Sequence, residues 1–122
     1  MFIAFLALQF VGLPPPNALW TKAIEEHRAC LLAKSAQLEP SDAEFDDIFA
    51  AAQAACAGSW LVLFEQAKTM VETGPRVRSG EDPSVIAKET ADSIENDFKA
   101  ESRLIVLRMR SARKQRENAP KH

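Results

Sequence analysis

Apolar positions recur at helical spacing in three long stretches of the chain. The first stretch covers residues 18–37 and follows Asn17, a residue type that caps helix starts well. Steps of four, three and four place one stripe of side chains on a single helix face. The sequence therefore predicts a first helix whose inner stripe consists of Trp20, Ile24, His27 and Leu31.

The second stretch covers residues 42–73 and has the clearest boundaries. Ser41 and Glu44 have the spacing of a capping box, in which each side chain bonds the backbone amide of the other residue. Gly74–Pro75 is a typical helix end, and a kink is expected at Gly58–Ser59 because such pairs weaken the hydrogen-bond ladder. The predicted apolar face consists of Phe45, Ile48, Phe49, Ala52, Cys56, Leu63, Phe64, Met70 and Val71.

The third stretch begins at Asp82–Pro83, an N-cap followed by proline at the first helical position, and is expected to reach about Arg113. Glu95 and Lys99 are four residues apart, which predicts an ion pair on the outer face of this helix. The predicted inward positions are Ala87, Ala91, Ile94, Phe98, Ile105 and Met109.

Three helices, scarce β-branched runs and no internal repeat predict an all-α fold, an antiparallel bundle of three helices. The helical domain is expected to span residues 17–115, followed by a frayed basic tail over residues 116–122. Residues 1–16 form an apolar segment that ends in prolines, and this segment is either a signal peptide or a short fourth helix.

The apolar run at the start of the chain also predicts a location. Its length suits the core of a signal peptide and is too short for a helix to cross a bilayer, so no transmembrane span is expected. No Lys or Arg precedes the run, and prolines occupy the place of a cleavage site. The periplasm or the extracellular space is the expected location, with the cytoplasm as the alternative.

Two cysteines lie in the first two predicted helices. In an exported chain an even number of cysteines suggests a bridge, whereas in a cytosolic chain Cys30 and Cys56 would be two small buried side chains. In a flush helical hairpin the two would miss each other by roughly 10 Å along the axis. The extended connection over residues 38–40 is long enough to absorb that offset, so the geometry permits a bridge without requiring it.

The residues around the cysteines resemble a group of small, uncharacterised, exported α-helical proteins of bacteria. The shared features are a cysteine in a first helix (Cys30), a turn containing Glu39–Pro40, a second helix with Ala51–Ala52 before Cys56, and an Arg-rich end. The resemblance covers about residues 20–110. It implies export and a Cys30–Cys56 bridge, and it implies no enzymatic activity.

Charge is divided unevenly along the chain. Residues 1–102 contain eight Lys and Arg against sixteen Asp and Glu, whereas residues 103–122 contain seven against one. With leucines between the basic residues, the end of the third helix is a basic amphipathic stretch of the kind that contacts anionic surfaces. Alternatively, the cations complement the helix dipole and neighbouring acidic helices. The candidate contact residues are Arg103, Arg108, Arg110, Arg113, Lys114 and Arg116.

Known arrangements of catalytic and metal-binding residues do not occur in the sequence. His27 and Cys30 form an H-x-x-C pair, but a metal site needs further ligands, and a core histidine beside a bridged cysteine explains the pair. The adjacent carboxylates Glu25–Glu26 and Asp46–Asp47 point about 100° apart on a helix, so neither pair is an acid–base dyad. We therefore predict no catalytic residues, no metal, no cofactor and no enzymatic function.

Together these features predict a non-enzymatic, exported structural or interaction protein of the bacterial envelope that binds a protein partner or an anionic surface through its third helix. The alternative is an intracellular regulatory or scaffold protein whose basic helix contacts nucleic acid or a partner. The lack of aromatic residues among the basic ones argues against nucleic acid. A small-ligand carrier is a third option, and the unequal helix lengths leave apolar surface that self-association could cover.

Overall fold

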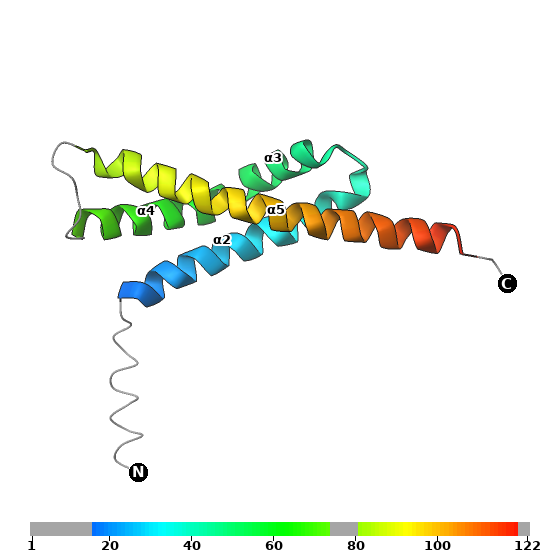
Figure 1. Ribbon diagram of the computed structural model, residues 1–122, viewed down its shortest axis with the longest axis horizontal. Coiled ribbons are helices and arrows are strands. Elements are labelled where there is room, and N and C mark those ends of the chain that lie inside the picture. The colour runs from blue at the N-terminus through cyan, green and yellow to red at the C-terminus, as the bar shows by residue number, and fades with distance from the viewer. Residues whose placement is uncertain (1–15, 74–80, 120–122) are drawn as a thin grey trace, which may run out of the picture.

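The computed structural model describes residues 16–73 and 81–119. The predicted signal segment therefore lies outside the described residues except for Pro16, as does the end of the predicted basic tail. In the described part every regular element is helical, which confirms the all-α prediction (Figure 1). The elements are α2 (Pro16–Leu38), the short 3-10 helix η1 (Glu39–Ser41), α3 (Phe45–Ala55), α4 (Ala57–Thr73) and α5 (Pro83–Glu117).

The chain crosses the molecule three times. Figure 1 shows α2 running in one direction, α3 and α4 returning, and α5 crossing again. The 35 residues of α5 extend about 52 Å at 1.5 Å per residue, and its C-terminal end projects past the other helices in this view. Both α2 and α5 pack against every other described element.

The predicted second helix is in fact two helices, which corrects the three-helix expectation. α3 and α4 meet at an angle of 70°, and the break lies at Cys56, before the predicted Gly58–Ser59 kink. The carbonyl of Cys56 accepts hydrogen bonds from the Ser59 hydroxyl at 2.9 Å and from the Trp60 amide at 3.0 Å, while its side chain is bonded to α2. No single helix in the described ranges is long and apolar enough to cross a membrane, although α3 and α4 together meet that test as a bent pair.

The predicted capping box before the second helix does not form. Ser41 lies in η1 and donates its hydroxyl to the Leu38 carbonyl at 2.8 Å, and Glu44 is the N-cap of α3 without a side-chain cap bond. Asp42 has a φ of 60°, in the left-handed region that single Asp and Asn residues tolerate. The turn at Asp42 ends η1, so α3 begins at Phe45, three residues later than predicted.

The start of α5 agrees with the prediction, but its inner face differs. Asp82 is the N-cap, and its carboxylate accepts a hydrogen bond from the Ser84 amide at 2.9 Å. Beyond Phe98 the fully buried positions are Ser102 and Val106, at steps of four. The predicted positions there, Ile105 and Met109, are only partly buried.

The apolar core consists of two adjoining clusters that share Ile24 and Ile94. One lies around the α2–α3 contact and the other around the α2–α4 contact, and α5 contributes to both. The buried members of the first are Leu31, Phe49, Ala52, Cys56 and Phe98, and those of the second are Ala23, Leu63 and Ala91. A polar group of side chains lies between these helices as well.

Candidate functional site

A hydrogen-bonded group centred on a buried histidine joins the four α-helices of the described part of the chain. His27 on α2 is fully buried; its Nδ1 lies 2.7 Å from Ser59 Oγ on α4, and its Nε2 lies 2.6 Å from Glu95 Oε2 on α5. The other oxygen of Glu95 accepts a hydrogen bond from the side-chain amide of Gln53 on α3. We call His27, Gln53, Ser59 and Glu95 the histidine network.

The positions of the protons in the network follow from its donors. Because the Ser59 hydroxyl donates to the Cys56 carbonyl at 2.9 Å, we assign a hydrogen to His27 Nδ1, which then donates to the Ser59 oxygen. Another proton lies between Nε2 and Glu95 Oε2, because two acceptors would not approach to 2.6 Å.

Burial makes the network a strict requirement of the fold. Glu95 is only 8% exposed, so its carboxyl group depends on His27 and Gln53 for the hydrogen bonds that water would otherwise supply. The sequence-based expectation that Glu95 pairs with Lys99 on the outer face of the helix is therefore wrong. Because each helix contributes one side chain, the network fixes the helices in one relative register.

The predicted Cys30–Cys56 disulfide is present beside the network. The S–S distance is 2.06 Å and the two Cα atoms are 6.0 Å apart. Cys30 follows His27 by one turn, so the H-x-x-C pair combines a core histidine with a bridged cysteine. Among the described residues there is no group of three His, Cys, Asp or Glu side chains that could hold a metal ion.

In space, Ser59, His27 and Glu95 follow one another as serine, histidine and acid, the arrangement that is known from hydrolases. In those enzymes the serine hydroxyl donates to the histidine, whereas here it donates to the Cys56 carbonyl. A shallow hollow of about 230 Å³ beside the network reaches its acid end and not the serine. It is lined by Gln53, Ala57, Trp60, Asp92 and Glu95. This geometry does not present Ser59 as a nucleophile.

The basic end of α5 is partly neutralised by a buried carboxylate. Glu39 is only 3% exposed, and its Oε1 lies 2.9 Å from Arg113 Nη1 and 3.8 Å from Arg110 Nε. Arg113 also pairs with Asp42 at 2.5 Å, and Arg110 donates to the Ala43 carbonyl. These contacts attach the C-terminal half of α5 to η1 and to the connection that follows it.

Arg103 is the third predicted contact residue that pairs within the molecule. Its guanidinium lies 3.6 Å from Asp46 Oδ1 and its Cζ lies 5.0 Å from the centre of the Phe45 ring. Lys99 approaches the same Asp46 oxygen at 3.5 Å and lies over Phe49. Asp46, in the first turn of α3, therefore pairs with two basic side chains of α5.

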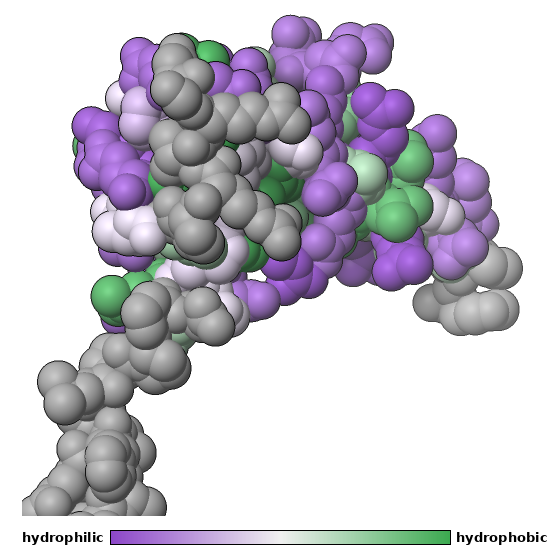
Figure 2. Space-filling model, turned by 60° about the vertical axis from the view of Figure 1, so that its left-hand side comes forward, coloured by the Kyte–Doolittle hydropathy of each residue, from purple (hydrophilic) through white to green (hydrophobic). Residues whose placement is uncertain are grey.

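The other predicted contact residues, Arg108, Lys114 and Arg116, are exposed and form no ion pair with any residue in the described ranges. Two leucines between them and Arg103 are also exposed, Leu104 by 54% and Leu107 by 53%. Figure 2 shows a mainly hydrophilic surface on which apolar residues occupy small separate areas.

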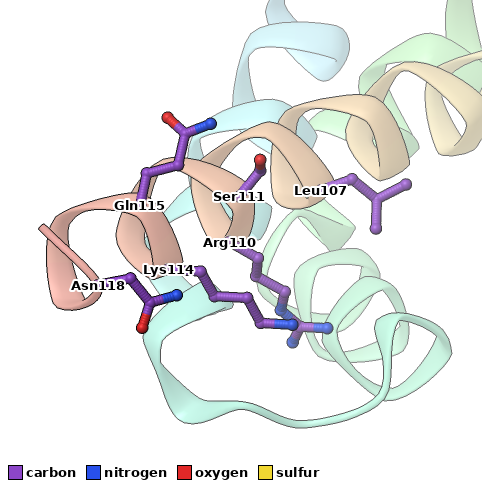
Figure 3. Close-up of a pocket in the computed structure, with 6 residues that line it drawn as sticks. All are labelled: Leu107, Arg110, Ser111, Lys114, Gln115 and Asn118. Carbon is purple, nitrogen blue, oxygen red and sulfur yellow. The ribbon is translucent and has the colours of Figure 1, made fainter.

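Figure 3 shows a shallow hollow along this end of α5. Arg110 and Lys114 extend toward the connection between η1 and α3, while Ser111 and Gln115 project in the other direction. The lining residues are Leu107, Arg110, Ser111, Lys114, Gln115 and Asn118. The hollow is therefore formed by a helix face and is polar except at Leu107.

An ion pair joins α2 and α5 through Arg28 and Glu101. Arg28 Nε donates to Glu101 Oε2 at 2.9 Å. This hydrogen bond, together with the positive charge of Arg28, holds the pKa of Glu101 below its ordinary value of 4.5, while the pKa of Arg28 is raised by the same hydrogen bond. Both groups are therefore charged at neutral pH.

The sequence-based reasoning missed two buried acids. Glu95 lies four residues after Ala91 and three before Phe98, so its helical spacing could have placed it on the inner face. Glu39 stands in a turn before Pro40, where no periodicity indicates burial.

Comparisons of the chain with protein-family models, with curated proteins and with solved structures find no match. The resemblance to exported helical proteins of bacteria therefore stays a prediction that depends on the residues around the two cysteines. The functional proposal below depends on the geometry of the described residues.

Proposed function

We propose that the protein is a non-enzymatic interaction protein of the bacterial envelope, exported to the periplasm or beyond, with α5 as its contact helix. The observation that carries the proposal is the outer face of α5. There, Leu104 and Leu107 are each more than half exposed and stand near Arg108 and Lys114, which have no acidic partner in the described part of the chain. This face of α5 therefore offers both apolar area and positive charge to another molecule.

The disulfide supports the proposed location. Disulfides form and persist in oxidising compartments and are rare in the bacterial cytoplasm. Cys30 and Cys56 are held at bridging distance by helices that also share the histidine network, so the bridge fits the fold without displacing any element.

The orientation of Ser59 supports a non-enzymatic role. Its hydroxyl donates to the Cys56 carbonyl, so it would have to turn toward His27 before it could act as a nucleophile. A fluorophosphonate probe should therefore leave Ser59 unlabelled on the folded protein. Labelling that disappears in Ser59→Ala and persists in Ser93→Ala, an exposed serine on α5, would contradict a non-enzymatic role.

The alternative is an intracellular scaffold whose basic helix contacts nucleic acid. The exposed, unpaired side chains of Arg108, Lys114 and Arg116 favour it, but three of the six predicted contact residues are already neutralised within the molecule. Fluorescence anisotropy with a labelled DNA duplex decides between the two. We expect no binding at low salt, and tight binding that weakens as salt is raised would support the alternative.

Export is tested by sequencing the N-terminus of the protein purified from its native host. The proposal predicts a mature chain that begins after Pro14, inside or beyond the proline run. A chain that retains Met1 and is recovered from the cytosolic fraction would contradict the proposed location and favour the intracellular alternative.

A further inference from the structure

We propose that the outer face of α5 binds an acidic amphipathic helix of a partner protein. This inference rests on the proposed function and names the partner's chemistry. The binding surface is a line of four residues, Ala100, Leu104, Leu107 and Ser111, which we call the α5 stripe. The stripe residues follow at steps of four, three and four, the spacing at which a helix presents a seam to another helix.

The stripe lies opposite the buried side of α5. Ser102 and Val106 are fully buried against the bundle, whereas Leu104 and Leu107 are 54% and 53% exposed. No described residue covers the two leucines. Leu104 and Leu107 are three residues apart, which is a spacing of apolar residues in the contact between two helices. A partner helix would therefore remove both side chains from water together.

Two hollows run end to end along this face of α5. One is lined by Asn96, Lys99, Ala100, Arg103, Leu104 and Leu107, and the second is the hollow of Figure 3. They share Leu107 and together contain all four stripe residues. Their volumes are about 500 and 680 Å³, so the face offers a continuous, shallow track along the helix axis, suited to an elongated ligand.

The charge on both sides of the stripe selects an acidic partner. Residues 103–116 contain six Lys and Arg and no Asp or Glu, and Arg108, Lys114 and Arg116 among them form no ion pair within the described part of the chain. By helical position, Arg103 and Lys114 flank one side of the stripe and Arg108 flanks the other. These are the flanking positions at which coiled-coil partners exchange salt bridges, so a helix with Glu or Asp there would be favoured.

The charges around the stripe disfavour two other possible partners, a second copy of the chain and an anionic lipid surface. A second copy of the chain paired through the stripe would bring two basic flanks together. An anionic lipid surface would meet the carboxylates of Asp42 and Asp46, which are 75% and 74% exposed beside the basic end of α5.

The test uses the full oxidised chain and two synthetic peptides. Each peptide has three heptads with Leu at positions a and d; one carries Glu at positions e and g, and the other carries Lys there. By isothermal titration calorimetry, the Glu peptide should bind and the Lys peptide should bind at least about tenfold more weakly, a difference of about 1.4 kcal/mol.

Matched variants show whether the stripe is the site. Leu104→Ser/Leu107→Ser should weaken binding of the Glu peptide at least about tenfold, since both leucines would lose their apolar contact with the partner helix. Leu61→Ser/Val62→Ser removes two side chains of α4 that are 53% and 47% exposed and should leave binding unchanged. Equal circular dichroism spectra of both variants show that folding is not the cause.

The inference is overturned if the Glu peptide does not bind, or if both double variants bind it equally. It is also overturned if sedimentation shows a dimer that the stripe variant abolishes, or if vesicles with anionic lipid bind the chain through Leu104 and Leu107. These failures leave the location and the lack of enzymatic activity untouched, because those are tested by the mature N-terminus and by the fluorophosphonate probe.

Discussion

Replacement of His27 by leucine and of Glu95 by glutamine should differ sharply in their effects on stability. His27→Leu keeps a similar side-chain volume but leaves the Glu95 carboxyl group buried with only Gln53 as a partner. Glu95→Gln keeps every hydrogen bond. The new amide can donate to Nε2 of a neutral imidazole and accept from Gln53, while Nδ1 still donates to Ser59.

The expected magnitudes follow from these contacts. Removal of one partner from a buried charged pair costs about 3–5 kcal/mol. The orphaned carboxyl group could become neutral instead, but protonation of a carboxylate in water at pH 7 itself costs about 4 kcal/mol. His27→Leu should therefore lower the free energy of unfolding by about 3–5 kcal/mol, a large part of the usual total of about 5–15. Glu95→Gln should cost less than about 1 kcal/mol because no donor or acceptor is left unpaired.

Urea unfolding at pH 7, followed by far-ultraviolet circular dichroism and extrapolated linearly to water, measures both values. The double variant His27→Leu/Glu95→Leu serves as a control, because replacement of both partners by apolar side chains should recover much of the loss. If Glu95→Gln costs as much as His27→Leu, the proton positions inferred for the network are wrong. If His27→Leu costs less than about 1 kcal/mol, the network does not hold the helices together.

Three further predictions concern other parts of the fold. Reduction of the disulfide, which closes 26 residues, should lower the free energy of unfolding by about 3.5 kcal/mol, measured by urea unfolding with and without a phosphine reductant. Glu101→Gln should lower the free energy of unfolding at neutral pH but not in strong acid. The depressed pKa of Glu101 means that its ion pair stabilises the fold fully above the ordinary value of 4.5, and that this stabilisation is lost as the pH falls through the folded-state pKa. An equal loss at pH 7 and pH 2 would contradict the role of Arg28. Leu63→Ala should cost about 2–5 kcal/mol because Leu63 is fully buried, whereas Leu61→Ala, 53% exposed on the same helix, should change the unfolding free energy by less than about 0.5 kcal/mol.

Helical periodicity was sufficient to predict the fold class and most of the core. The stripe of α2 and the N-cap at Asp82 depend on neighbours within one helix, and the structure confirms both. The capping box at Ser41 failed because Asp42 adopts a left-handed conformation that ends η1 first. The helix break fell at Cys56 because the bridge to α2 and the Ser59 hydroxyl both act there, and both depend on contacts across the bundle.

Charged residues were harder to predict because their burial depends on distant partners. Glu95 was expected to pair with Lys99 at i,i+4, yet its partner is His27, 68 positions away in the sequence. Lys99 pairs with Asp46 instead. Local sequence rules assign ion pairs on exposed helix faces, whereas a buried acid takes whichever donor another helix supplies.

The candidate contact surface could be located only in part. The excess of basic residues after position 102 was clear in the sequence, and it identified the right end of the chain. Which of these residues are neutralised by Glu39, Asp42 and Asp46, and which stay free, depends on how α5 packs on η1 and α3. The exposure of Leu104 and Leu107 follows from the same packing.

The proposal of an exported interaction protein stabilised by a disulfide is tested most directly by the thiol state of the protein in its native host. Cells are lysed in acid, free thiols are alkylated under denaturing conditions, and the digest is examined by mass spectrometry without reductant. The proposal predicts a linked pair of peptides that contain Cys30 and Cys56 and no alkylated form of either. Two alkylated cysteines in freshly lysed cells would contradict an oxidising location, and with it the proposed function in the envelope.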